Sequence, residues 1–166
     1  MILVFGNPTL AFSILLFILL ISSGLGSYWA SRITPSRLPV VISFAAATVA
    51  LGGIIYAVTL GSVVSSLFAQ SLPATIILVL LITTPMGLAM GIPFSSSLRL
   101  LREIDRKDIP LAWGINGVMS VMGSALAVAI AMQFGFSAAF AVGALFYMVV
   151  AVVSYTSRSE NLAAGS

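Results

Sequence analysis

The sequence predicts an all-α integral membrane protein, a bundle of about five transmembrane helices. Three observations lead to this fold class. Hydrophobic residues make up 60% of the chain, charged residues only 7%, and the mean hydropathy is +1.20, which is far from the composition of a water-soluble domain. The chain contains five long apolar segments, and the connections between these segments alternate between charged and uncharged.

The five predicted spans follow one another with short connections. Each has about 20 residues, the length that a helix needs to cross a hydrocarbon core of about 30 Å. The spans cover residues 8–29, 39–60, 75–98, 110–132 and 137–155. We therefore expect residues 1–156 to form a single helical transmembrane domain, followed by a polar cytoplasmic tail over residues 157–166.

Three segments leave alternatives open. The first span lacks the basic residue that precedes the apolar run of a signal peptide, which favours a span over a cleaved signal. Residues 62–73 are expected to form a loop on the outer face, with a short interfacial turn of helix as the alternative. Pro85 and Pro93 fall inside the third span, where each removes a backbone hydrogen bond, so this helix has either a static bend or a hinge.

The charged residues are confined to alternate connections. All seven basic and all four acidic residues follow the first, third or fifth span, and the other two connections have none. Because basic loops face the cytoplasm, this pattern predicts an outer amino terminus and a cytoplasmic carboxyl terminus in the inner membrane of a bacterium. The predicted interfacial anchors at the same span ends are Tyr28, Trp29, Trp113 and Tyr155.

The basic residues are candidates for contact with a cytoplasmic partner or with anionic lipid. These candidates are Arg32, Arg37, Arg99, Arg102, Arg106 and Lys107. Acidic and basic residues alternate along residues 98–108, as is typical of a solvated, self-paired loop or short helix. The net charge of +3 does not indicate nucleic-acid binding, because every basic residue lies beside a span end.

Two stripes of small and polar residues are candidates for helix packing or for lining a ligand site. Residues three or four apart share one face of a helix, and small residues let two helix backbones approach closely in lipid. The stripe of the third span comprises Thr84, Gly87, Gly91 and Ser95, and that of the fourth comprises Asn116, Gly117, Ser120, Gly123 and Ser124. The sequence leaves both roles open.

Several residue types are missing from the sequence. The chain has no cysteine and no histidine, and no predicted span has a charged residue near its centre. Proton-driven carriers and enzymes with acid–base pairs usually need such groups. We therefore expect no catalytic residue, no metal site and no cofactor, and the same absence argues against a complete proton-driven transporter.

Two stretches of sequence carry a resemblance to a known family. PMGLAMGIPFSSSLRLL and IPLAWGINGVMSVMGSALAVAIAMQFGFSAAF resemble the membrane region of bacterial spermidine-synthase-like multi-span proteins, whose helices are somewhat similar to those of major-facilitator transporters. The resemblance is most specific across residues 85–136. It implies that ten residues belong to the characteristic helix pair of this family, without implying their role: Gly91, Pro93, Arg99, Trp113, Gly114, Asn116, Gly117, Ser120, Gly123 and Ser124.

The chain also departs from these families. GLGSYWASRI resembles a short cytoplasmic loop of major-facilitator proteins, but Ser31 occupies the place of the usual acidic residue before Arg32. No glycine-rich nucleotide loop follows a strand, so aminopropyl-transfer chemistry does not carry over, except through a separate partner.

We expect a non-catalytic inner-membrane protein that serves as an accessory or scaffold subunit of a larger membrane assembly. The alternative is a transporter-like module that binds or moves a small molecule together with a partner subunit. The expected partners are membrane lipids and other membrane protein subunits, and not nucleic acid.

Overall fold

A computed structural model of the chain describes residues 8–68 and 72–164, and these residues form helices joined by short turns. The five long helices are α2 (Pro8–Ser31), α3 (Leu38–Phe68), α4 (Leu72–Ile104), α5 (Ile109–Phe134) and α6 (Phe136–Ala164). Single 3₁₀ turns, Pro35–Arg37 and Arg106–Asp108, precede α3 and α5. The prediction of an all-α fold is confirmed, and all five helices are long and apolar enough to cross a membrane.

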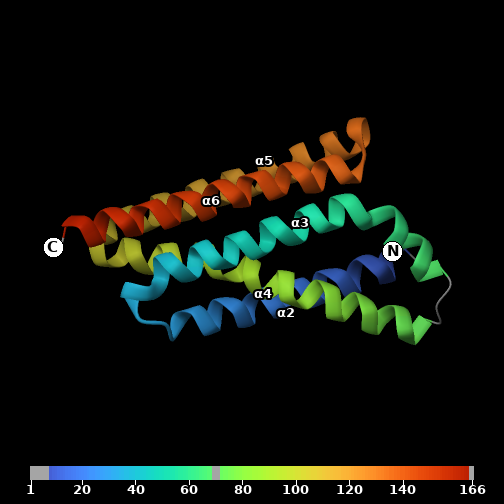
Figure 1. Cartoon of the computed structure of the whole chain (residues 1–166), viewed down its shortest axis with the longest axis horizontal. Helices are drawn as coiled ribbons and strands as arrows, with labels where there is room; N and C mark the ends of the chain where they lie inside the picture. The colour runs from blue at the N-terminus through green and yellow to red at the C-terminus, as the bar shows by residue number, and fades with distance from the viewer. Residues whose placement is uncertain (1–7, 69–71, 165–166) are drawn as a thin grey trace.

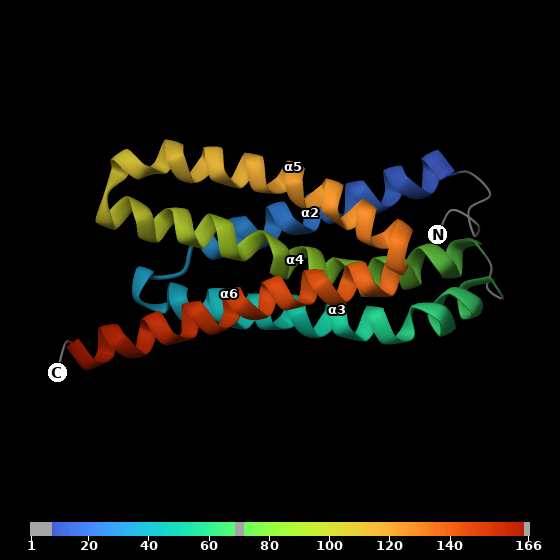
Figure 2. The same ribbon diagram turned by 90° about the horizontal axis from the view of Figure 1, so that it is seen from above.

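The helices lie roughly along one direction, and in the view of Figure 1 α3 lies between α6 and the α2–α4 pair. The main contacts pair α2 with α4 and α3 with α6, and contact between α3 and α4 joins the two pairs. Helix α5 contacts α6 and α4. Figure 2 shows that α5 and α6 meet at their connection and diverge away from it.

The core of the bundle consists of small and branched apolar side chains. Ala30 of α2, Ala45 and Val49 of α3, and Ala89 and Ile92 of α4 form one buried cluster. Alanine at a helix contact allows the backbones to approach closely, so that dispersion contacts replace the hydrophobic force that lipid does not supply. These three helices therefore form the packed centre of the molecule.

Several helices continue beyond the predicted spans. The expectation of a loop over residues 62–73 is wrong for residues 62–68, where α3 continues to Phe68, and for residues 72–73, where α4 begins. Residues 69–71 lie outside the described residues. Residues 62–68 include no glycine or proline to end a helix. Helix α4 likewise runs through Pro85 and Pro93 to Ile104, and α6 continues to Ala164, through most of the predicted polar tail.

A single residue, Gly135, separates α5 from α6. Its φ of 86° lies in a region that favours glycine, and its N–H donates to the carbonyl oxygen of Ala131 at 3.0 Å. Helices α5 and α6 are therefore antiparallel neighbours with almost no connecting chain.

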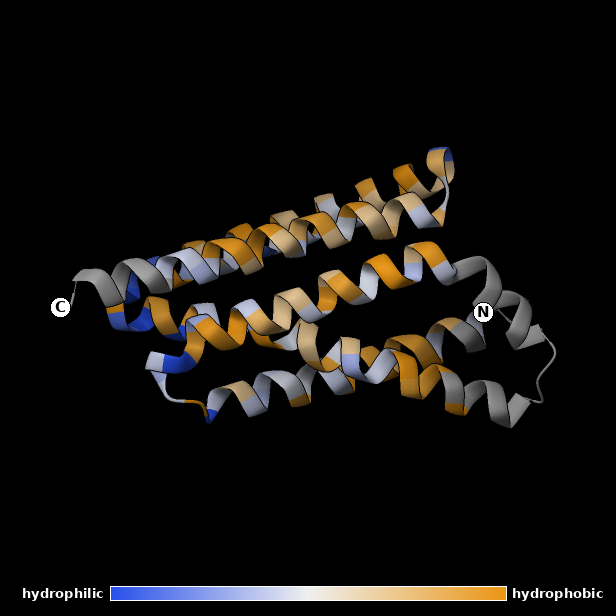
Figure 3. Cartoon of the chain, viewed as in Figure 1, coloured by the Kyte–Doolittle hydropathy of each residue, from blue (hydrophilic) through white to orange (hydrophobic). Residues whose placement is uncertain are grey.

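Hydrophilic residues gather at one end of the bundle, where the α2–α3 and α4–α5 connections meet the carboxyl-terminal part of α6 (Figure 3). We call this the charged end, and define it by the described residues 32–37 and 99–108. The middle of the helices is predominantly apolar, as the alternation of charges along the sequence predicts.

Candidate helix-contact site

The stripe of α4 lies against α2. A Cβ atom added at Gly91 would overlap the backbone carbonyl of Ser23, and one added at Gly87 would overlap the Ser22 hydroxyl. Both glycines are therefore points where the two helices approach too closely for any side chain. The other members of this stripe, Thr84 and Ser95, are half-buried.

Helix α2 also contributes a glycine to this contact. A Cβ atom at Gly26 would overlap the carbonyl oxygen of Leu88 on α4. The buried Ser22 hydroxyl donates to the Ile18 carbonyl of its own helix at 2.6 Å, so it is satisfied without an α4 partner. Sequence analysis did not single out α2 for this role, although the run SSGLGS at residues 22–27 has the required small residues.

Arg99 continues the α4 stripe to the charged end, where it bonds inside the protein. Its guanidinium is half-buried, and Nη1 donates to the carbonyl oxygen of Ala30 at 2.6 Å. Ala30 lies in the last turn of α2, where the helix dipole favours a cation; its carbonyl oxygen also accepts from the Ile33 N–H at 3.2 Å. Arg99 thus links α4 to the carboxyl-terminal end of α2.

The matching stripe of α5 has no such neighbour. Asn116 is half-buried, and Ser120 and Ser124 are exposed. Within the described part of the chain, no heavy atom outside the helix's own backbone and the adjacent residues lies within 4 Å of a Cβ atom placed at Gly117 or Gly123, and none of the residues of α5 is buried.

The polar groups of this stripe are only partly satisfied. Ser120 donates to the Asn116 carbonyl at 2.7 Å, and Ser124 donates to the Val121 carbonyl at 2.8 Å. Both hydroxyls are therefore satisfied within α5. Among the described residues, no hydrogen bond to the Asn116 amide is present. The stripe offers a close-packing surface with one unused amide, that of Asn116, about two turns from the start of an apolar helix.

Helix α5 is fixed near its two ends. Near its start, the Trp113 ring meets Phe94 of α4 edge to face, with ring centroids 5.1 Å apart. At its other end, Gly135 joins it directly to α6. These attachments hold α5 in place without covering the stripe between them.

The remaining basic candidates lie at the charged end, on the surface. Arg32 stacks over the Tyr28 ring, with 4.6 Å between the guanidinium carbon and the ring centroid, and donates to the Tyr28 hydroxyl. Arg37, Arg102, Arg106 and Lys107 are exposed. The four predicted anchors, Tyr28, Trp29, Trp113 and Tyr155, are between 55% and 64% exposed.

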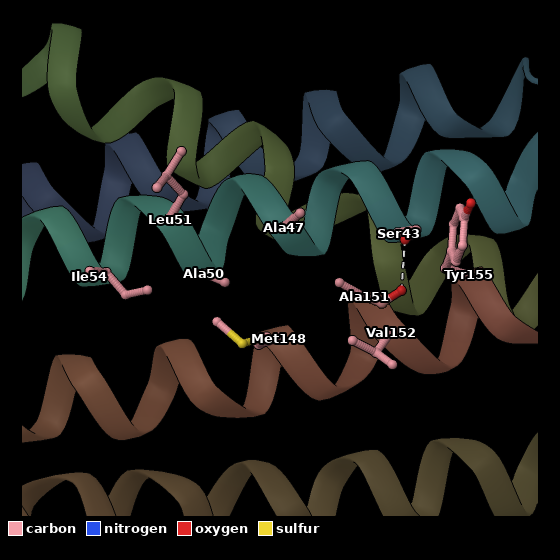
Figure 4. A pocket seen from close by; sticks show the side chains of 9 residues that line it. All are labelled: Ser43, Ala47, Ala50, Leu51, Ile54, Met148, Ala151, Val152 and Tyr155. Carbon is pink, nitrogen blue, oxygen red and sulfur yellow. Dashed lines mark hydrogen bonds between the residues drawn. The ribbon is translucent and has the colours of Figure 1, made fainter.

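Two shallow grooves lie on the surface of the described residues. One, of about 350 Å³, lies between α3 and α6 and is almost wholly apolar (Figure 4); beside it, Ser43 donates to the Ala151 carbonyl at 2.7 Å. The other, of about 430 Å³, lies at the charged end, with Glu103 as its one charged lining residue. Neither groove brings together an acid–base pair, and within residues 8–68 and 72–164 no group of histidine, cysteine or carboxylate residues is suited to holding a metal ion.

Comparison with protein-family models, with curated proteins and with solved structures gives no match for the chain. The resemblance of residues 85–136 to spermidine-synthase-like proteins therefore stays a prediction.

Proposed function

We propose that this chain is a non-catalytic, multi-span membrane protein that serves as an accessory or scaffold subunit of a larger membrane assembly, with α5 as its contact helix. One observation carries the proposal. The described chain leaves the small and polar stripe of α5 without a helix neighbour, whereas α2 occupies the equivalent stripe of α4.

In the proposed setting, lipid surrounds the exposed side of α5. In lipid, helices associate through close packing and interhelical hydrogen bonds, and a polar group without a partner is unfavourable there. The Asn116 amide would gain a hydrogen bond and Gly117 would gain packing contacts if a partner helix lay along the stripe. A lipid tail offers neither the hydrogen bond nor a rigid surface.

The proposal includes a membrane and an orientation. We infer a bacterial inner membrane with the charged end in the cytoplasm, because the charged residues collect at one end of the bundle and basic connections favour that side. An odd number of spans then places the amino terminus outside.

The test is the mass of the protein isolated from membranes in mild detergent. The chain alone has a mass of 17.3 kDa, and we expect a defined complex of greater mass. Ser120→Leu places a bulky side chain in the stripe and should dissociate that complex. Val118→Leu is the matched control, because Val118 lies about 160° around the helix from Ser120 and is also exposed.

The proposal fails if the wild-type chain is a folded monomer under these conditions. It also fails if Val118→Leu dissociates the complex as completely as Ser120→Leu, because the effect would then not belong to the stripe.

The unused Asn116 amide also favours a second candidate, a transporter-like module that binds a polar small molecule together with a partner. Asn116→Leu separates the two functions when assembly and uptake are measured independently. Lost uptake with intact assembly supports the module, whereas lost assembly supports the scaffold.

A further inference from the structure

Some basic residues of the charged end have acidic residues in the same segment, which neutralise their charge, and others do not. Residues 102–108 contain three basic and three acidic side chains, so this segment is neutral overall. The Asp105 carboxylate also accepts from the Lys107 backbone N–H at 2.9 Å and caps the 3₁₀ turn there. The α4–α5 connection therefore offers little net attraction to an anion.

Arg99 already has a hydrogen-bond partner within the protein. Its hydrogen bond to the Ala30 carbonyl holds the guanidinium between α4 and the end of α2. Of the basic candidates in the described residues, Arg32 and Arg37 remain, both exposed and both in the α2–α3 connection. No acidic residue precedes Glu103 in the sequence. Glu103 lines the groove beside Pro39, and no ion pair between it and Arg37 is present in the described structure.

The α2–α3 connection is too short to leave headgroup depth if α2 and α3 both span a membrane. One candidate span ends at Ser31 and the next begins at Pro35, so Arg32 and Arg37 are too close to apolar helix to extend far into water. The exposed Trp29 ring lies on the same turn, as interfacial aromatic residues do.

Arg32 is also positioned before any ligand arrives. The stacking of its guanidinium on Tyr28, together with its bond to the Tyr28 hydroxyl, restricts a side chain that is otherwise flexible. A guanidinium held in this way loses less conformational freedom when it binds, and its planar N–H groups match the oxygen atoms of a phosphate.

We propose that Arg32 and Arg37 form a binding site for the phosphate group of an anionic membrane lipid. The preference for an anionic lipid comes from two cations that no acidic side chain of the described residues neutralises. The short connection keeps both cations at the level of the lipid headgroups. The proposal is independent of the α5 contact, because Arg32 and Arg37 lie in the α2–α3 connection and no residue of the α5 stripe takes part.

Tryptophan fluorescence tests this site directly. The chain has two tryptophans, so Trp113→Phe leaves Trp29 as the only one, next to the site, and keeps an aromatic ring beside Phe94. We would reconstitute this variant in bilayers containing brominated phosphatidylglycerol or brominated phosphatidylcholine, since bromine quenches tryptophan at short range. We expect stronger quenching by the anionic lipid at equal mole fraction.

Substitutions then assign the preference to residues. Arg32→Gln and Arg37→Gln should each lower the preference for phosphatidylglycerol about fivefold, the effect of one basic residue near an anionic surface. Arg106→Gln removes the same charge from the neutral segment and should leave the preference within about twofold of the parent. If Arg32→Gln does not fold, Arg37→Gln carries the test, because Arg37 has no contact with Tyr28 to lose.

Three results would overturn the proposal. Equal quenching by both lipids would show no anion preference. An Arg106→Gln effect as large as that of Arg37→Gln would show general electrostatic attraction without a site. Relief of quenching by soluble glycerol phosphate would show that free phosphate, and not a lipid headgroup, is the preferred ligand.

Discussion

Gly91 and Gly117 are the same residue type in opposite surroundings. At Gly91 the backbone of α2 occupies the place of a side chain, whereas at Gly117 that place is empty. A methyl group therefore has opposite consequences at the two positions. At Gly91 it forces two packed helices apart, and at Gly117 it only removes the flexibility that glycine gives a helix.

We accordingly predict that Gly91→Ala lowers the free energy of unfolding by about 1–3 kcal/mol, the usual effect of overpacking. Gly117→Ala is the matched control and should leave the stability of the isolated chain unchanged or raise it by up to about 1 kcal/mol. Thermal unfolding of both variants in the same detergent measures the difference. Equal stability of the two variants would contradict the close α2–α4 contact.

Gly87, Gly91 and Arg99 show which contacts could be predicted from the sequence and which could not. The four-residue spacing of Gly87 and Gly91 placed both glycines on one helix face and made that face a candidate for packing, because the spacing is local. It did not indicate α2 as the neighbour, since that choice depends on the whole bundle. Arg99 was grouped with the surface cations by its position in the chain, and only the arrangement of α2 beside α4 brings its guanidinium to the Ala30 carbonyl.

At the scale of elements, α3 and α6 form the second close pair of the bundle. The Tyr56 and Phe140 rings stack with centroids 5.4 Å apart, and the Ser43 hydroxyl donates across to the Ala151 carbonyl. Such a bond adds a directional contact between helices that face each other mostly through apolar residues.

We predict that Ser43→Ala destabilises the α3–α6 pair by about 0.6 kcal/mol, the average for hydrogen bonds between helices in a membrane. Thr48→Ala is the control, because the Thr48 hydroxyl donates to Phe44 of its own helix. Chemical unfolding in mixed micelles compares the two variants. A larger loss for Thr48→Ala would contradict the assignment of the interhelical bond.

The elements themselves were well predicted in number and type, and less well in extent. Hydropathy predicts which residues of a helix lie in the lipid. It does not predict where the helix ends, because a helix can continue beyond the membrane surface. Helix α3 continues through residues 62–68 because nothing in that stretch breaks it. Gly135, by contrast, ends α5 two residues beyond the predicted span, at a backbone angle that favours glycine.

At the scale of the whole molecule, the distribution of charge gives the bundle two different ends. Both described charged connections lie at one end, while the α5–α6 turn at the other has no charged residue. The sequence predicted this asymmetry, because the charged residues occur in alternate connections along the chain. The sequence could not predict that one side of α5 is uncovered, since exposure depends on where the other four helices lie.

We predict that a cysteine at Ser36 is labelled only from the cytoplasmic side, and one at Ser137 only from outside. Both serines are exposed. Ser36 lies in the α2–α3 connection, and Ser137 is the second residue of α6, beside the α5–α6 turn at the opposite end. The chain has no cysteine of its own. Membrane-impermeant maleimide applied to intact cells and to inverted vesicles measures both. Labelling of both positions from the same side would contradict the orientation.

The turn at Gly135 bears on how the protein enters the bilayer. A connection of one residue leaves α6 little freedom to move apart from α5 at that end. We therefore expect the last two helices to enter the bilayer together as a hairpin, so that a residue inserted at this turn should impair membrane insertion as well as the finished fold.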